Sequence, residues 1–241
     1  MALYRDDGVV LRTYRLGEAD RIVVFYTRSH GKVRAVAKGV RRTKSKFGAR
    51  LEPASIVHLQ LYEGRNLDIV TQAESVGPLP QLRTDLDRFG RASVLLEVID
   101  QIGTEGEPDP MLFKLLTGAL TELDRAGNPM VVPAFVARVL VLEGVQPLLE
   151  ACVHCGTEVD LVAIDLSEGG VLCREHRRGE PISNGARAVF EHLFEGRVRQ
   201  VLEATSEPVA SEVEQMASRM IEQHIERRLK SSTVLHQHLA T

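Results

Sequence analysis

The sequence predicts an α+β protein in which a small N-terminal β-barrel precedes a helical region that carries a short cysteine-containing ribbon. Three observations predict this fold class. Apolar residues alternate with period two through residues 1–78, but they recur every three or four residues from Asp85 onward. All three cysteines fall between residues 152 and 173. A chain of 241 residues that is 44% apolar can form one large domain or a few small ones.

Five segments of the N-terminal region have the alternating pattern of β-strands. We place these strands at residues 8–16, 20–27, 32–38, 55–62 and 66–74, with turns at residues 29–31 and 63–66. Five short strands in about 75 residues fit a small closed barrel, and the five-stranded oligonucleotide-binding barrel (OB-fold) is a common architecture of this size. The Gly-Pro-Leu-Pro run at residues 77–80 then ends the pattern and marks a domain boundary.

Helical periodicity predicts an all-α C-terminal domain. Asp85 is the expected N-cap of a first helix. Four apolar side chains of that helix fall on one side: Leu86, Phe89, Leu96 and Ile99. A second helix begins near Asp109 and ends near Gly127, and a third follows Pro129 and ends at Gly144. Two more helices are predicted at residues 184–204 and 208–230.

A zinc-ligand spacing is the strongest motif in the chain. Its four members follow the pattern C-x2-C-x17-C-x2-H: Cys152, Cys155, Cys173 and His176. Two thiolates separated by two residues can reach one tetrahedral ion, and four such ligands close the site, so we predict a structural Zn²⁺. Its binding would supply folding energy to a ribbon too short to bury its own core. His154 is the alternative fourth ligand, and three buried or redox-active thiols are the competing interpretation.

These patterns predict the organisation of the whole chain. An OB-fold nucleic-acid-binding domain is expected at residues 1–78, followed by the first part of the helical domain at 79–150. A zinc-binding module, the inserted zinc ribbon, follows at 151–180, and the second part of the helical domain at 181–241. We find no targeting segment, and the apolar stretch at residues 131–142 is much shorter than the ~20 residues that span a bilayer. A cytoplasmic location is expected.

A basic strip lies within an otherwise acidic chain of net charge −3. Residues 32–50 contain eight cations and no acidic residue. Lys32 and Arg34 are alternate residues of a predicted strand and therefore share one face. We predict that seven of the cations bind DNA: Lys32, Arg34, Lys38, Arg41, Arg42, Lys44 and Lys46. Because aromatic residues are sparse, phosphate contacts should dominate, which predicts salt-sensitive and sequence-tolerant binding. The alternative is a solvated loop without a partner.

The sequence contains no motif that predicts catalysis. There is no GxxxxGK[ST] phosphate loop, and the His-x-Glu that zinc deaminases require before their Pro-Cys-x-x-Cys is missing. A zinc ion closed by four protein ligands also lacks the open position of a catalytic metal. We therefore predict that the protein is not an enzyme and that no residue is catalytic.

The chain resembles the RecO family, the bacterial recombination mediators. The resemblance is carried by the motifs at residues 8–12, 17–20, 31–42 and 51–53 and by the cysteine pairs that follow the first helices. It implies a non-enzymatic protein of recombinational DNA repair that acts in response to DNA damage in the cytoplasm, associated with the nucleoid. It also implies binding of single- and double-stranded DNA, annealing of complementary strands and, with RecR, loading of RecA onto strands coated by single-strand binding protein (SSB).

Two other functional classes remain open from the sequence. The first is an RNA-binding or transcription-associated module built from the same OB-fold and zinc ribbon. The second is an enzyme with an open zinc site. A preference for RNA strands would distinguish the first class, and a reaction lost on chelation without unfolding would distinguish the second.

Overall fold

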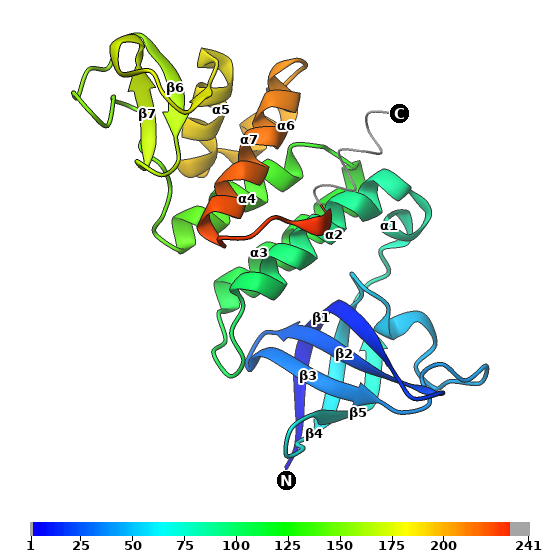
Figure 1. The fold of residues 1–241 in the computed structure, drawn as a ribbon. Helices are drawn as coiled ribbons and strands as arrows, with labels where there is room; N and C mark the ends of the chain where they lie inside the picture. The colour runs from blue at the N-terminus through cyan, green and yellow to red at the C-terminus, as the bar shows by residue number, and fades with distance from the viewer. Residues whose placement is uncertain (1, 232–241) are drawn as a thin grey trace. The chain divides into compact units, whose positions relative to one another are not determined.

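The computed structural model describes residues 2–231, which form two compact units (Figure 1). Unit 1 contains residues 2–127 together with Ser231, and unit 2 contains residues 128–230. Residues 232–241, which the sequence assigns to the second part of the helical domain, lie outside the described residues. Among the helices of the described residues, none has the length and apolar character needed to cross a membrane.

Unit 1 begins with a closed five-stranded barrel, as the sequence predicts. Its strands, drawn in blue to cyan in Figure 1, are β1 (Leu3–Leu16), β2 (Asp20–Thr27), β3 (Gly31–Ala37), β4 (Ile56–Tyr62) and β5 (Asp68–Ser75). They pair in the order β1-β2-β3-β5-β4, and only the β3–β5 pair is parallel. The predicted fold class, a five-stranded OB-like barrel followed by helices, is confirmed.

The first strand is longer than the sequence predicts. It starts at Leu3 rather than Gly8, and its first half pairs with β4 from Leu3 opposite Tyr62 to Asp7 opposite His58. The consecutive charged residues at positions 5–7 hide this half from a hydrophobic pattern search, because backbone pairing holds it in the sheet.

The loop between β3 and β4 contributes to the barrel core. Its Phe47 and Leu51 are each only 1% exposed and pack in the same apolar cluster as Val23 and Phe25 of β2. The short 3₁₀ helix Gly48–Leu51 carries the second of these side chains inward. Two buried side chains therefore anchor a loop whose composition is otherwise mostly polar.

Three helices complete unit 1. They are α1 (Pro80–Thr84), α2 (Leu86–Ile102) and α3 (Pro110–Ala126). Asp85 caps α2 by accepting a hydrogen bond from the Arg88 N–H at 3.1 Å, in agreement with the predicted N-cap. Leu96 and Ile99 are buried as predicted, but Leu86 (63% exposed) and Phe89 (37% exposed) are not. The first turn of α2 extends beyond the apolar core, which a helical repeat in the sequence cannot reveal.

Unit 2 combines a three-stranded ribbon with helices. The ribbon consists of β6 (Leu161–Asp165), β7 (Gly170–Cys173) and β8 (Glu180–Pro181), paired in the order β7-β6-β8. The helices are α4 (Val131–Leu142), α5 (Asn184–Phe194), α6 (Val198–Ala204) and α7 (Val209–His224). The predicted continuous helix at 184–204 was wrong, because Gly196 adopts a left-handed φ of +84° and separates α5 from α6. The last helix ends at His224, short of the predicted residue 230.

A close backbone contact joins β3 to the segment between α2 and α3. The Lys32 N–H donates to the Thr104 carbonyl at 3.0 Å. Gly31 has a φ of +65°, and a Cβ at this position would lie 2.6 Å from the carbonyl oxygens of both Thr104 and Glu107. Only glycine satisfies both the left-handed backbone and the narrow space.

Gly31→Ala should therefore destabilise unit 1 by about 3 kcal/mol or more, because a left-handed alanine costs roughly 1–2 kcal/mol and the backbone must also move. Gly17→Ala is the matched control, since Gly17 also has a left-handed φ (+57°) but no atom within 4 Å of an added Cβ. Urea unfolding followed by tyrosine fluorescence measures the effect in unit 1, which holds all four tyrosines of a chain without tryptophan. Equal losses in the two variants would contradict the steric argument.

Candidate functional site

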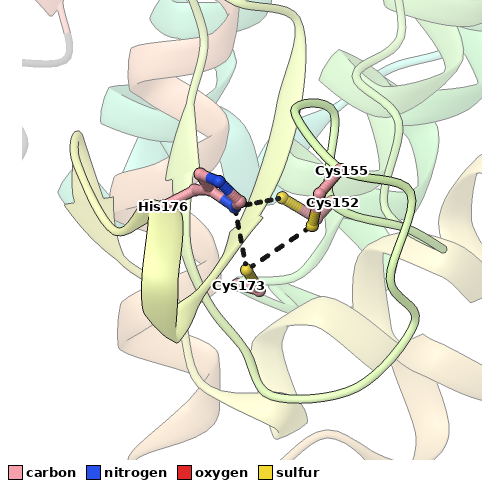
Figure 2. Close-up of side chains that lie close together, drawn as sticks. All are labelled: Cys152, Cys155, Cys173 and His176. Carbon is pink, nitrogen blue, oxygen red and sulfur yellow. Dashed lines mark hydrogen bonds between the residues drawn. The ribbon is translucent and has the colours of Figure 1, made fainter.

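Four metal-ligand side chains converge in unit 2. Their ligand atoms all lie within 4.8 Å of one another: those of Cys152, Cys155, Cys173 and His176. The Sγ atoms of Cys155 and Cys173 are 3.9 Å apart, and the His176 Nδ1 lies 3.3 Å from the Cys173 Sγ and 3.9 Å from the Cys152 Sγ. Figure 2 shows the three sulfur atoms and the imidazole directed toward a common centre. This cluster could hold a metal ion.

Local backbone contacts hold the first cysteine pair in a tight turn. The Gly156 N–H donates to the Cys152 carbonyl and the Cys152 N–H donates to the Thr157 carbonyl, both at 2.8 Å. Gly156 has a left-handed φ of +76°, which favours glycine at this position. The second pair is delivered by the ribbon, since Cys173 ends β7 opposite Leu161 of β6. The β6–β7 hairpin thus brings the two pairs of ligands together.

The histidine in the cluster is His176. His154 lies on the exposed turn between the first two cysteines, and its ring packs against that of His176 with centroids 4.3 Å apart. The ligand atoms of His154 do not join the convergent set found among the described residues. The geometry therefore favours His176 over His154 as the fourth ligand.

The surroundings of the thiols favour a bound cation. Burial alone would raise the pKa of the Cys152 thiol, but hydrogen bonds from the backbone N–H groups of Cys173, His154 and Cys155 outweigh it and lower this pKa to about 6. The Thr157 N–H lowers the pKa of Cys155, whereas desolvation and the two neighbouring thiols raise it more, so the net shift is upward. A thiol beside a thiolate resists ionisation, and a central cation removes this repulsion.

The predicted DNA-binding cations lie in unit 1, and six of the seven are exposed. These are Arg34, Lys38, Arg41, Arg42, Lys44 and Lys46. On β3, Val33, Ala35 and Ala37 are buried, whereas Arg34 is exposed on the outer face. Lys32 is the exception, since its ammonium donates to the Asp100 carbonyl at 2.8 Å and lies 3.9 Å from the Asp100 carboxylate. We refer to the six exposed residues as the cationic strip.

The loop that carries most of the strip has an ordered backbone. The Arg41 N–H donates to the Ala19 carbonyl at 2.9 Å, and the Gly39 N–H donates to the Asp20 carboxylate at 2.7 Å. At the far end of the loop, the Lys46 ammonium donates to the Thr71 carbonyl at 2.8 Å. Together with the buried Phe47, these contacts fix the loop against the β1–β2 turn and β5.

Strand β1 adds side chains that the sequence prediction of the site omitted. The register places Arg12 and Arg34 on either side of Val24, so their Cα atoms are two strand spacings, or about 10 Å, apart. The Arg12 guanidinium lies 5.1 Å from the centroid of the Tyr14 ring, which is 43% exposed. An irregularity in the pairing between Val10 and Arg12 shifts the alternation of β1, so the outward direction of these residues could not be read from the sequence.

The carboxylate of Asp100 in α2 forms ion pairs with cations from two strands, β1 and β3. Its side chain is 5% exposed, and its Oδ2 lies 2.8 Å from Arg12 Nη1 while its Oδ1 faces Lys32. The Lys32 side chain is 18% exposed, whereas that of Arg12 is 50% exposed. The Lys32 side chain is thus largely enclosed by its contacts within the fold, whereas half of the Arg12 side chain remains accessible to solvent.

The fold and the clustered side chains define a protein with an OB-like barrel, a helical C-terminal region and a possible Cys3His metal site. Comparison with known sequences identifies the family. The profile of the recombination protein O N-terminal region matches residues 1–79, and that of its C-terminal region matches residues 83–233. The chain belongs to the RecO family of DNA repair proteins.

Curated relatives support the same assignment. A protein named DNA repair protein RecO from Bifidobacterium longum (strain DJO10A) is 42% identical over 237 residues, which cover 96% of this chain and 98% of the relative. A relative of the same name from Bifidobacterium longum subsp. infantis is 43% identical over the same length. A third from Cutibacterium acnes is 46% identical over 181 residues, covering 72% of this chain and 74% of the relative.

Asp100→Asn should destabilise unit 1 by about 2 kcal/mol, because it leaves the largely buried Lys32 ammonium without a negative partner. Glu52→Gln is the control, since the Arg21–Glu52 pair at 2.7 Å is more exposed and should cost less than about 1 kcal/mol. Urea unfolding followed by tyrosine fluorescence compares the two variants. A cost for Asp100→Asn no larger than that for Glu52→Gln would show that Lys32 does not depend on this carboxylate.

Proposed function

We propose that this chain is a non-enzymatic mediator of recombinational DNA repair that binds DNA through the cationic strip of unit 1. One observation carries the proposal. Arg34, Lys38, Arg42 and Lys44 are exposed on an ordered strand and loop and form no ion pair with any described residue. Exposed cations without acidic partners are available to a polyanion, which releases its own counterions when they bind.

The chemistry of the strip fits sequence-tolerant binding. Lysine and arginine side chains contact phosphates, which fix the position of a strand but carry no sequence information. Tyr14 and Tyr62 are the exposed aromatic residues of the described barrel strands, and each lies two strands from Val36 of β3, so base stacking adds few contacts beside the cations. Many weak phosphate contacts suit a protein that must hold a strand and later release it.

The finer roles follow from family membership and are part of the proposal. Annealing requires only that charge repulsion between two strands be reduced, and this needs no catalytic residue. Single- and double-stranded DNA are the proposed ligands. RecR and SSB are the proposed protein partners, and RecA is an indirect one. A cytoplasmic, nucleoid-associated site of action agrees with DNA as ligand. The binding domain is proposed to end at residue 78, before the helical segments and the metal module.

We further propose that the Cys3His cluster holds a structural Zn²⁺. A tetrahedral zinc with bonds of about 2.0–2.3 Å places neighbouring ligand atoms about 3.3–3.8 Å apart. Three of the six separations, at 3.3–3.9 Å, are close to these values, and all six are within 4.8 Å. Four protein ligands leave no open position for a substrate, so the ion would stabilise the ribbon rather than act in a reaction.

Replacing Arg42 and Lys44 together by alanine should weaken binding of all single-stranded DNA sequences alike. The slope of log affinity against log salt concentration should flatten by about 0.7 for each lost phosphate contact. The matched control is Arg65→Ala with Lys114→Ala, which removes two exposed cations of unit 1 outside the strip. Fluorescence anisotropy over a salt series measures both effects.

Equal effects of the two double variants would place the DNA-binding surface elsewhere. Parallel titrations with RNA strands of the same sequence address the alternative function. A clear preference for RNA would replace the DNA repair role with an RNA-binding one.

The metal proposal predicts one zinc ion per chain. Cys173→Ser and His176→Ala should each lose the ion and unfold the ribbon, because binding in isolated zinc-finger peptides contributes about 10 to 16 kcal/mol. His154→Ala should retain it. Elemental analysis measures the metal, and far-UV circular dichroism follows the secondary structure of the whole chain. Tyrosine fluorescence tests whether unit 1 stays folded, so a loss of dichroism without a change in fluorescence is assigned to unit 2. Retention of zinc by His176→Ala and loss by His154→Ala would exchange the roles of the two histidines.

A further inference from the structure

Two adjoining hollows in unit 1 continue from the end of the cationic strip. The first, of about 320 Å³, is bordered by Lys46, Arg50 and Arg83. The second, of about 230 Å³, is lined mainly by apolar side chains: Pro53, Ile56, Pro78, Leu79, Pro80 and Phe89. Both are also lined by Ser75 and Arg83, so they share a border, and we refer to the two hollows together as the groove.

The groove has one charged end and one apolar end. The first hollow has two cations from the strip loop and a third from α1, and neither hollow has a carboxylate among its lining residues. Arg83 stands at the junction, where its Nη2 donates to the Ala49 carbonyl at 3.1 Å and to the Ser55 hydroxyl at 3.0 Å. This arrangement suits a ligand in which an anionic group and an apolar ring are joined over a short distance.

Phe89 is the aromatic side chain of the apolar end. It is 37% exposed although it belongs to a helix whose Leu96 and Ile99 are buried. Proline rings line the same hollow and offer further flat apolar surface. The hollow is smaller than the 300–1,000 Å³ typical of sites for drug-sized ligands, so it would hold a single ring system.

We propose that this groove is a base-binding subsite for single-stranded DNA. The phosphates continue from the strip onto Lys46, Arg50 and Arg83, and one unstacked base lies against Phe89 in the apolar hollow. This inference rests on the proposed DNA-binding function and adds to it a contact that depends on the base rather than on charge. An acidic peptide with apolar side chains has similar chemistry. DNA is favoured because the groove is a direct continuation of the cationic strip.

Duplex DNA should not use the subsite, because its bases remain stacked and paired. Single-stranded DNA should use it with little sequence preference, since every base has a flat π-face. The subsite would thus give the protein a means to distinguish an open strand from a duplex that the phosphate contacts alone do not provide.

The chain has no tryptophan, so Phe89→Trp introduces a single fluorescent reporter into the subsite. An oligothymidine should quench this tryptophan on binding, whereas an abasic oligonucleotide of the same length should bind with little quenching. Tyr62→Trp is the control. Tyr62 is 38% exposed. It lies six residues along β4 from Ile56, which lines the hollow, so Tyr62 is about 20 Å from the hollow. Its tryptophan should respond equally to the two ligands, because any change there would come from phosphate contacts and not from a base in the hollow.

Phe89→Ala should weaken binding of the oligothymidine about tenfold, in the range of one lost stacking contact, and leave the salt slope unchanged. Its affinity for duplex DNA should not change, and Phe89→Trp should keep the original affinity for single strands. Because Phe89 is partly exposed in the first turn of α2, circular dichroism should show a folded protein in both variants.

The outcomes separate this inference from the proposed function. If the protein binds no DNA at all, the proposed function itself fails. If it binds and the Arg42 and Lys44 variant weakens binding, but the Phe89→Trp reporter is not quenched and Phe89→Ala has no effect, the subsite alone is refuted. Stronger quenching by a peptide of alternating aspartate and leucine than by the oligonucleotide would identify the groove as a peptide site.

Discussion

The burial of two side chains from the β3–β4 loop is the constraint on which the proposed DNA binding by unit 1 depends. Phe47 and Leu51 enter the barrel core. The loop around them is hydrogen bonded to the β1–β2 turn through the Arg41 N–H and to β5 through the Lys46 ammonium. A loop with so many like charges would extend and move if it were held only at its ends. Because its apolar residues are fixed inside, its cations remain together on the outside, and the repulsion among them persists until an anion binds.

The corresponding feature of unit 2 is the convergence of four metal-ligand side chains rather than the burial of a loop. The ribbon contains short strands, the last of which has only two residues, although Leu161, Ile164 and Leu172 are buried. The proposed Zn²⁺, held by three sulfurs and one imidazole nitrogen, would add to the stability of these short strands. This explains why ligand spacing was so informative in the sequence: the ligands are close neighbours on two turns joined by one hairpin, and local geometry determines their positions.

The sequence predicted the features that depend on local pattern and missed those that depend on packing. Alternation located the barrel, and capping chemistry located the start of α2 at Asp85. The internal pairing of Lys32 could not be predicted, because Asp100 is 68 residues away in the chain. The exposure of Phe89 was missed because a periodic pattern does not show where a core ends. The helix break at Gly196 was missed for a different reason, because the apolar periodicity was followed across a glycine that adopts a left-handed φ.

The division of the cations between folding and binding follows from their neighbours. Lys32 and Arg34 are alternate residues on one face of β3, yet the first lies against a buried carboxylate of α2 and the second is exposed. Transferring Lys32 to a phosphate would leave Asp100 with one cation fewer in a poorly hydrated site, a cost that offsets much of the new contact. Arg34, Lys38, Arg42 and Lys44 incur no such cost. The residues best suited to bind a polyanion are therefore those that the fold does not use.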